Sequence, residues 1–87
     1  MTITEITNTS EWNQLECDFM VPDIAYATWY FDGEFWYPDE NLGSNTVEVK
    51  TGYGARLTAP GYLDCTEWVI FDTELEATQY LYDTYCD

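Results

Sequence analysis

Basic side chains are almost absent from this chain of 87 residues. It contains only Lys50 and Arg56 against 17 aspartates and glutamates, so its formal net charge at pH 7 is −15. Nucleic-acid binding draws much of its affinity from lysines and arginines that displace counterions from the phosphates. Two basic residues among so many acids cannot supply that affinity, so we expect no direct binding to nucleic acid. An anionic membrane surface is repelled for the same reason.

Histidine is absent, which removes the commonest general base and the commonest transition-metal ligand. Cys17, Cys65 and Cys86 are widely spaced and form no CxxC pair, so they lack the spacing of zinc ligands. No phosphate-binding glycine loop, dinucleotide-binding glycine pattern or GxSxG sequence is present. We therefore expect a protein that is not an enzyme and that uses no cofactor and no metal.

Long apolar runs are missing as well. No stretch approaches the roughly 20 residues that cross a bilayer, and the N-terminal segment lacks the basic start and apolar run of a signal peptide. An odd number of cysteines cannot all pair within one chain, which fits a reducing compartment. We expect a cytoplasmic protein that contacts no membrane, with Cys17 and Cys65 as small core side chains.

Aromatic side chains, in contrast, are plentiful: four Trp, eight Tyr and four Phe. Each large ring buries about 150–250 Å². Highly charged chains that lack aromatic residues are typically disordered, whereas this chain can fill a small core. Its length suits one domain, which we assign to residues 1–87.

Residues 25–37 predict a hairpin that turns at Asp32-Gly33. An Asp-Gly pair between strand-like runs favours a two-residue type I′ turn. That turn would pair Trp29 with Trp36 on one face of the hairpin and Tyr30 with Phe35 on the other.

Two further strands are predicted in residues 46–50 and 54–59. A three-residue loop at residues 51–53 keeps their apolar side chains on one face and sets Glu48 opposite Arg56. Residues 65–71, CTEWVIF, predict a fifth strand, and its continuous apolar end favours a central position in the sheet.

Helices are predicted at both ends of the chain. Thr9 or Ser10 caps a short helix ended by Pro22, unless the N-terminal segment is irregular. Residues 73–76, TELE, form a capping box that starts a helix running to about Tyr85. The fold class is therefore α+β, an antiparallel sheet of about five strands with a C-terminal helix packed on one face. We expect that helix to cover Trp29 and Trp36, with Trp68 nearby.

The carboxylates provide the functional argument. Side chains on one face of a strand lie about 6.8 Å apart, and helix residues at i and i+4 lie about 6 Å apart, which resembles phosphate spacing along a nucleic acid. Carboxylates so placed can occupy a groove that evolved for phosphates, where arginine binds them in a bidentate manner. The candidate residues are Asp32, Glu34, Asp39 and Glu40 near the hairpin tip and Glu76, Asp83 and Asp87 on the helix.

Other interpretations remain open. If no helix covers one face of the hairpin, side chains including Tyr26 and Tyr37 form an exposed aromatic patch, and such patches mark interfaces. The protein would then be an interaction or assembly module whose acids confer only solubility. A third possibility is a small-ligand binder that stacks a carbohydrate on tryptophan and tyrosine. The acids also suit a soluble or halophilic surface without any partner.

In overall character, this small, acidic, aromatic-rich chain resembles phage-encoded inhibitors of host defence, a class that includes nucleic-acid mimics and anti-CRISPR proteins. The segment WVIFDTELEATQYL, a strand running into a capped helix, is typical of small phage proteins. The resemblance implies a stoichiometric inhibitor acting in the host cytoplasm. Its partner would be a basic nucleic-acid-binding host protein, such as a CRISPR effector, a restriction enzyme, RNA polymerase or a repair enzyme.

Overall fold

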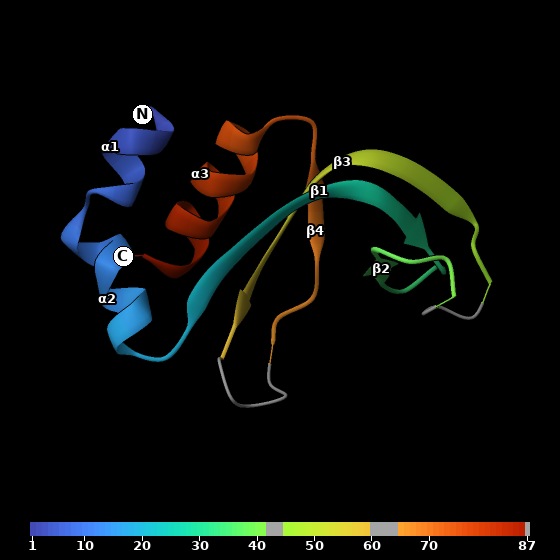
Figure 1. Cartoon of the computed structure of the whole chain (residues 1–87), viewed down its shortest axis with the longest axis horizontal. Helices are drawn as coiled ribbons and strands as arrows, with labels where there is room; N and C mark the ends of the chain where they lie inside the picture. The colour runs from blue at the N-terminus through green and yellow to red at the C-terminus, as the bar shows by residue number, and fades with distance from the viewer. Residues whose placement is uncertain (42–44, 60–64, 87) are drawn as a thin grey trace.

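The computed structural model describes residues 1–41, 45–59 and 65–86. Its helices and strands are α1 (Ile3–Thr7), α2 (Ser10–Cys17), β1 (Val21–Phe31), β2 (Trp36–Tyr37), β3 (Glu48–Thr58), β4 (Val69–Phe71) and α3 (Glu74–Tyr85). The strands form one antiparallel sheet in the order β2-β1-β3-β4, and α3 packs against it (Figure 1). The predicted α+β class and the position of the C-terminal helix are confirmed, with four strands where about five were expected.

Both N-terminal helices begin at a threonine cap. The Thr9 hydroxyl accepts the N–H of Trp12 at 3.2 Å, which confirms the predicted start of α2. The preceding helix was not predicted, although Thr2 and Glu5 form a reciprocal capping box at its start. The chain leaves α2 before Phe19, which has a φ of 61° and is 70% exposed. Pro22 therefore does not end the helix but lies inside β1.

The long antiparallel pair of β1 and β3 forms the centre of the sheet. Its register runs without interruption from Val21 opposite Thr58 to Phe31 opposite Glu48. The predicted loop at residues 51–53 is therefore wrong, and two expected strands are one. The predicted Glu48–Arg56 pair is also wrong, because Arg56 lies opposite Asp23.

Two glycines explain why β3 continues through this segment. The side chain of Trp29 lies directly against Gly54, where a Cβ atom would overlap the indole ring. Its Nε1–H donates a hydrogen bond of 2.9 Å to the carbonyl of Gly52. Gly54 therefore allows a large ring to lie close to the strand backbone. At Gly52 a Cβ atom would overlap the backbone carbonyl of Phe71, so this glycine allows β4 to lie close, and both glycines serve packing rather than a turn.

The hairpin between β1 and β2 has a wider turn than predicted. The carboxylate of Asp32 accepts the N–H groups of Glu34 at 2.9 Å and Phe35 at 2.8 Å. Gly33 adopts a φ of 99°, which glycine reaches without steric cost. An aspartate that binds the backbone two and three residues ahead closes a loop of residues 32–35 in place of the expected two-residue turn.

The wider turn changes which residues of β1 and β2 lie opposite each other, but each side chain stays on the face of the sheet that was predicted for it. Tyr30 lies opposite Tyr37 and Phe31 opposite Trp36, so the predicted pairs Trp29–Trp36 and Tyr30–Phe35 are wrong. The register differs from the predicted one by two residues, and side chains alternate with a period of two. Trp36 therefore remains on the same face as Trp29, and its ring packs on Phe31 with the centroids 4.9 Å apart.

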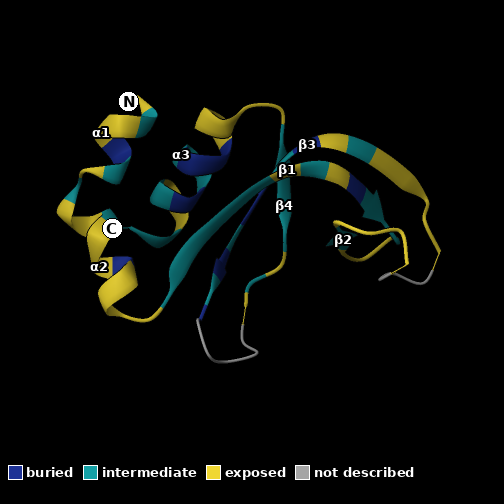
Figure 2. Ribbon diagram, in the orientation of Figure 1, coloured by how far each residue is buried: buried dark blue, intermediate teal, exposed yellow. Residues whose placement is uncertain are grey.

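The two faces of the sheet are covered differently. Helix α3 packs on one face and forms a core with α2 and β3, and Figure 2 shows this buried stripe. The buried residues of that core are Leu15, Ala55, Leu57, Ala77 and Leu81. Trp29 is fully buried on the opposite face, the face of Gly54, where its ring lies 4.7 Å from that of Trp68. The predicted neighbourhood of Trp29 and Trp68 is confirmed. The prediction that α3 covers Trp29 and Trp36 is wrong, since alternation directs both to the face opposite the α3 core.

Strand β4 lies at an edge of the sheet and not at its centre. Phe71 packs toward α3, with its ring 5.2 Å from that of Tyr80, whereas Ile70 lies opposite Gly54 on the other face. Because β4 has apolar contacts on both faces of the sheet, its sequence VIF is continuously apolar although it is an edge strand. At the other edge, β2 pairs with only Tyr30 and Phe31, so residues 21–29 of β1 have no second strand partner among the described residues.

Helix α3 begins as the sequence predicts. The Thr73 hydroxyl accepts the N–H of Glu76 at 3.1 Å and donates to the Glu76 carboxylate at 3.0 Å. Cys17 and Cys65 are exposed, so the prediction that they are core side chains is wrong. In the described part of the chain, no helix is long and apolar enough to cross a membrane.

Candidate partner-binding surfaces

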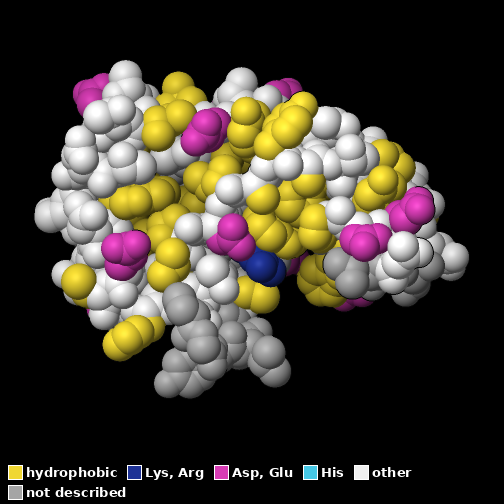
Figure 3. Space-filling model, in the orientation of Figure 1, with side chains coloured by type: hydrophobic (Ala, Val, Ile, Leu, Met, Phe, Trp, Pro, Cys, Tyr) yellow, Lys and Arg dark blue, Asp and Glu magenta, His cyan; other side chains and the backbone are white. Residues whose placement is uncertain are grey.

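Both basic side chains of the protein are engaged in ion pairs with acids. Lys50 Nζ lies 3.7 Å from Asp72, and Arg56 Nε lies 3.1 Å from Asp23. The remaining acids have no lysine or arginine within ion-pairing distance in the described residues, and most are exposed. Acidic side chains are spread over the face seen in Figure 3 rather than gathered in one patch. The protein therefore presents a broad negative field to a partner.

The four candidate acids of the hairpin tip lie on the two loops that flank β2. Two of them shape their loops: Asp32 closes the turn described above, and Asp39 accepts hydrogen bonds from the backbone and side-chain nitrogens of Asn41 at 3.0 and 3.2 Å. Glu34 and Glu40 are exposed. A partner therefore meets two exposed glutamates at this tip, together with two carboxylates already used by the loops.

The candidate acids of the helix form a separate pair. Glu76 and Asp83 are exposed on α3, and Asp83 accepts a hydrogen bond of 2.9 Å from Gln79. Their separation of seven residues corresponds to about 10.5 Å along the helix axis. This pair is wider than the phosphate-like spacing of about 6 Å that i and i+4 residues would give. The third candidate, Asp87, lies outside the described residues.

The tip and helix acids do not form one continuous site. Helix α3 packs near Ile24 and Ala55, whereas the tip follows Phe31. Along β1, the distance from Ile24 to Phe31 is about 23 Å at the usual rise per strand residue. Figure 1 shows α3 and β2 toward opposite ends of the sheet. The sequence grouped these acids as one surface, and the structure divides them into two clusters.

The candidate Tyr26 lies on an exposed part of the sheet. On the face that α3 packs against, the side chains of Tyr26 and Val49 are 66% and 56% exposed, so the helix leaves this part of the face uncovered. The rings of Tyr26 and Tyr53 pack at 4.9 Å between centroids. An uncovered aromatic area is therefore present, as the alternative interpretation requires.

Tyr37, the other aromatic candidate, lies beside the acids of the hairpin tip. Loss of hydration raises the pKa of its phenol, and the charges of Asp32 and Glu34 with a hydrogen bond to Asp32 raise it further. The neutral phenol is favoured where a phenolate would meet two carboxylates. The negative potential of the tip thus extends to Tyr37.

A cleft of about 470 Å³ that the sequence did not reveal lies next to Tyr37. We call it the aromatic cleft, and the residues important here are Phe35, Trp36, Tyr37, Arg56, Glu67 and Trp68. It opens on the Trp29 face of the sheet, between the hairpin tip and the segment of residues 65–68. The sequence signal on this face of the sheet was Gly54, which leaves room for the ring of Trp29.

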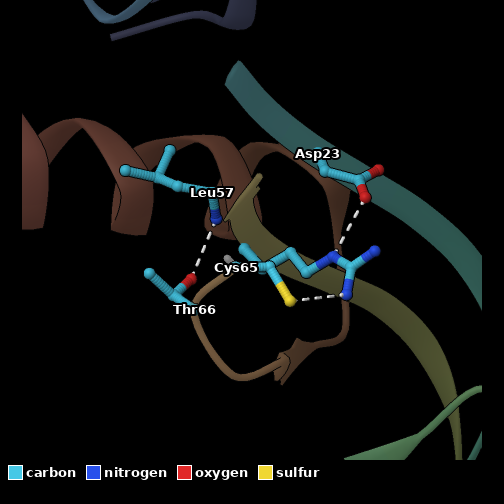
Figure 4. Close-up of polar contacts among 5 residues, drawn as sticks. Asp23, Leu57, Cys65 and Thr66 are labelled. Carbon is cyan, nitrogen blue, oxygen red and sulfur yellow. Dashed lines mark hydrogen bonds and ion pairs between the residues drawn. The ribbon is translucent and has the colours of Figure 1, made fainter. Parts of the chain in front are cut away.

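The segment that carries Trp68 is held against β3 by a few specific contacts. The Thr66 hydroxyl accepts the N–H of Leu57 at 2.9 Å, and the N–H of Thr66 donates to the Leu57 carbonyl at 2.9 Å. Arg56 Nη1 donates to Cys65 Sγ at 3.4 Å, and the guanidinium lies 4.3 Å from the centroid of the Trp68 ring. Figure 4 shows these polar contacts together with the Asp23–Arg56 ion pair. One wall of the aromatic cleft is therefore preformed.

No family model, curated protein or solved structure matches this chain. The functional argument therefore depends on the surfaces described above: two clusters of acids, an uncovered aromatic area around Tyr26, and the aromatic cleft.

Proposed function

We propose that the protein is a non-enzymatic inhibitor that binds the basic nucleic-acid-binding groove of a host protein and blocks it by nucleic-acid mimicry. The observation that supports this proposal is the engagement of both basic side chains, Lys50 by Asp72 and Arg56 by Asp23. The other acids are left uncompensated, and such a field attracts a basic protein surface while repelling nucleic acid itself.

The arrangement of the two acid clusters suits an extended groove. Ile24, near which α3 packs, and Phe31, which precedes the tip, are about 23 Å apart along β1, and this length corresponds to about seven nucleotide steps at 3.4 Å each. Arginines that line such a groove bind carboxylates with strong, charge-assisted hydrogen bonds. Long-range attraction would make association fast, and added salt would slow it.

The overall resemblance to phage-encoded inhibitors suggests the class of target. A CRISPR effector, a restriction enzyme, RNA polymerase or a repair enzyme each has a basic groove, and an inhibitor of this kind would meet it in the host cytoplasm. Binding would be stoichiometric and would require no cofactor.

The uncovered aromatic area supports a second candidate function. Tyr26 and Val49 lie exposed on the sheet beyond the end of α3. In this alternative, the protein is an interaction or assembly module that binds through the sheet face, and its acids maintain solubility.

Salt dependence separates the two functions. A host protein captured from a lysate at low salt is purified, and its affinity is measured at 50 and 500 mM NaCl. Groove binding should weaken by at least about tenfold, because exposed charges are screened beyond about 8–10 Å. An affinity that is unchanged over this range would contradict mimicry and favour the sheet face.

Charge reversal provides a matched test. Glu76→Lys with Asp83→Lys should abolish inhibition and leave the fold intact, since both side chains are exposed. Glu11→Lys with Glu16→Lys changes the net charge equally on α2 and should retain most of the inhibition. If Tyr26→Ala abolishes inhibition while the α3 reversal does not, the interface is the sheet face.

A further inference from the structure

We propose that the aromatic cleft binds the guanidinium group of an arginine side chain supplied by the partner protein. This inference rests on the proposed function, because it names the group that a basic partner would insert. It also assigns a role to the side chains between the hairpin tip and residues 65–68, which the acid clusters leave unexplained.

The walls of the cleft present aromatic rings from two separate segments. Trp36 comes from β2 and is supported by Phe31, with 4.9 Å between the ring centroids. Trp68 is supported by the buried Trp29 at 4.7 Å. Rings held in place by such contacts lose little freedom when a ligand stacks on them, which favours binding.

Arg56 shows how this environment accommodates a guanidinium group. Its guanidinium lies 4.3 Å from the centroid of the Trp68 ring, and its Nε donates to Asp23 at 3.1 Å. Stacking on an aromatic face combined with a carboxylate at the edge is the arrangement that arginine prefers. Trp68 already contacts both Trp29 and Arg56, so an incoming guanidinium would stack on Trp36 across the cleft.

The charges around the cleft favour a cation over an anion or a neutral ligand. Asp23 neutralises Arg56, and the exposed Glu67 lines the cleft as a second carboxylate. Tyr37 lines the cleft, and the nearby charges of Asp32 and Glu34 add negative potential there. A free phosphate or a nucleotide would be repelled. Arginine is favoured over lysine because its planar, weakly hydrated cation can stack on a ring and bind a carboxylate at the same time.

The test uses the intact protein and small probes of matched shape. N-acetylarginine amide is titrated while the indole N–H signals of the four tryptophans are followed by NMR. N-acetylcitrulline amide has the same shape without the charge, and N-acetyllysine amide has the charge without the planar group. We expect the arginine probe to shift the signals of Trp36 and Trp68 and to leave that of Trp12 unchanged. Binding should weaken at least threefold with lysine and should not be detected with citrulline.

A conservative variant locates the carboxylate. Glu67→Gln should weaken the arginine probe about two- to fivefold, the range of an exposed ion pair. Glu48→Gln removes an equal charge from an exposed residue of β3 that does not line the cleft, and it should leave affinity nearly unchanged. Equal shifts by arginine and citrulline, or equal losses in the two variants, would overturn the proposal.

The outcome is separable from that of the proposed function, because the probes require no host protein. Absence of arginine binding together with salt-dependent inhibition overturns the cleft assignment alone. Specific arginine binding together with a salt-independent host complex overturns groove blocking alone.

Discussion

The contact between Trp29 and Gly54 allows a sharp test of how this sheet is packed. In Gly54→Ala, the new methyl group would overlap the indole ring of Trp29, which is fully buried and cannot move outward without disturbing Trp68. Overpacking of this kind typically costs about 1–3 kcal/mol. For a domain of this size, a loss of about 2 kcal/mol lowers the melting temperature by about 8–16 °C.

A second substitution identifies the ring as the cause. In the Trp29→Phe background, the smaller ring leaves space beside Gly54, so Gly54→Ala should cost less than half as much as in the wild type. The difference between the two costs is the coupling energy of a double-mutant cycle, which is typically 0.5–3 kcal/mol for residues in contact.

The assay is urea unfolding followed by far-UV circular dichroism, which does not depend on the tryptophan that is changed. Thr28→Ala serves as a control, because Thr28 is exposed and lies in β1 next to Trp29. It should change the free energy of unfolding by less than about 1 kcal/mol. An equal cost of Gly54→Ala in both backgrounds would refute the argument that Gly54 accommodates the ring.

Two further substitutions examine α3. Thr73→Ala removes the hydroxyl that caps the helix and should lower the free energy of unfolding, measured in urea, by about 1 kcal/mol. Thr4→Ala, at an exposed threonine in α1, should lower it less, and equal losses of stability would contradict the capping role. Burial raises the pKa of the Tyr80 phenol, so stability from the neutral form is complete below about pH 10 and decreases as the pH rises further. Tyr80→Phe should make this decrease shallower in melts between pH 9 and 11, and an unchanged slope would contradict the assignment.

Local signals predicted where α2 and α3 begin, because an N-cap and its partner are close in the sequence. Thr73 and Thr9 satisfy N–H groups only three residues away, and nothing elsewhere in the fold competes for them. The turn at Asp32 was located correctly but given the wrong length. Its carboxylate accepts two backbone N–H groups, and this choice depends on geometry that the residue types do not specify.

The same residue type serves different purposes in β3, and the sequence did not distinguish them. Gly52 fits a turn as well as a close approach of another strand, and only the backbone carbonyl of Phe71, distant along the chain, decides between these uses. A loop at residues 51–53 sets Arg56 opposite Glu48, whereas in the structure Arg56 lies opposite Asp23. A prediction with this loop therefore does not bring Arg56 to the aromatic cleft. Exposure of Glu76 and Asp83 followed from the helix pattern. The separation of the two acid clusters follows from the length of β1, which begins at Val21, before the predicted hairpin of residues 25–37.

The incomplete edge of β1 has a consequence for the colloidal behaviour of the protein. Residues 21–29 have no second strand partner among the described residues, and unpaired edges invite strands from other copies. Pro22 withdraws one hydrogen-bond donor, and the charge of −15 keeps two copies apart. Each acid replaced by lysine reduces that mutual repulsion, so the same carboxylates that would attract a basic partner also protect the strand edge from self-pairing.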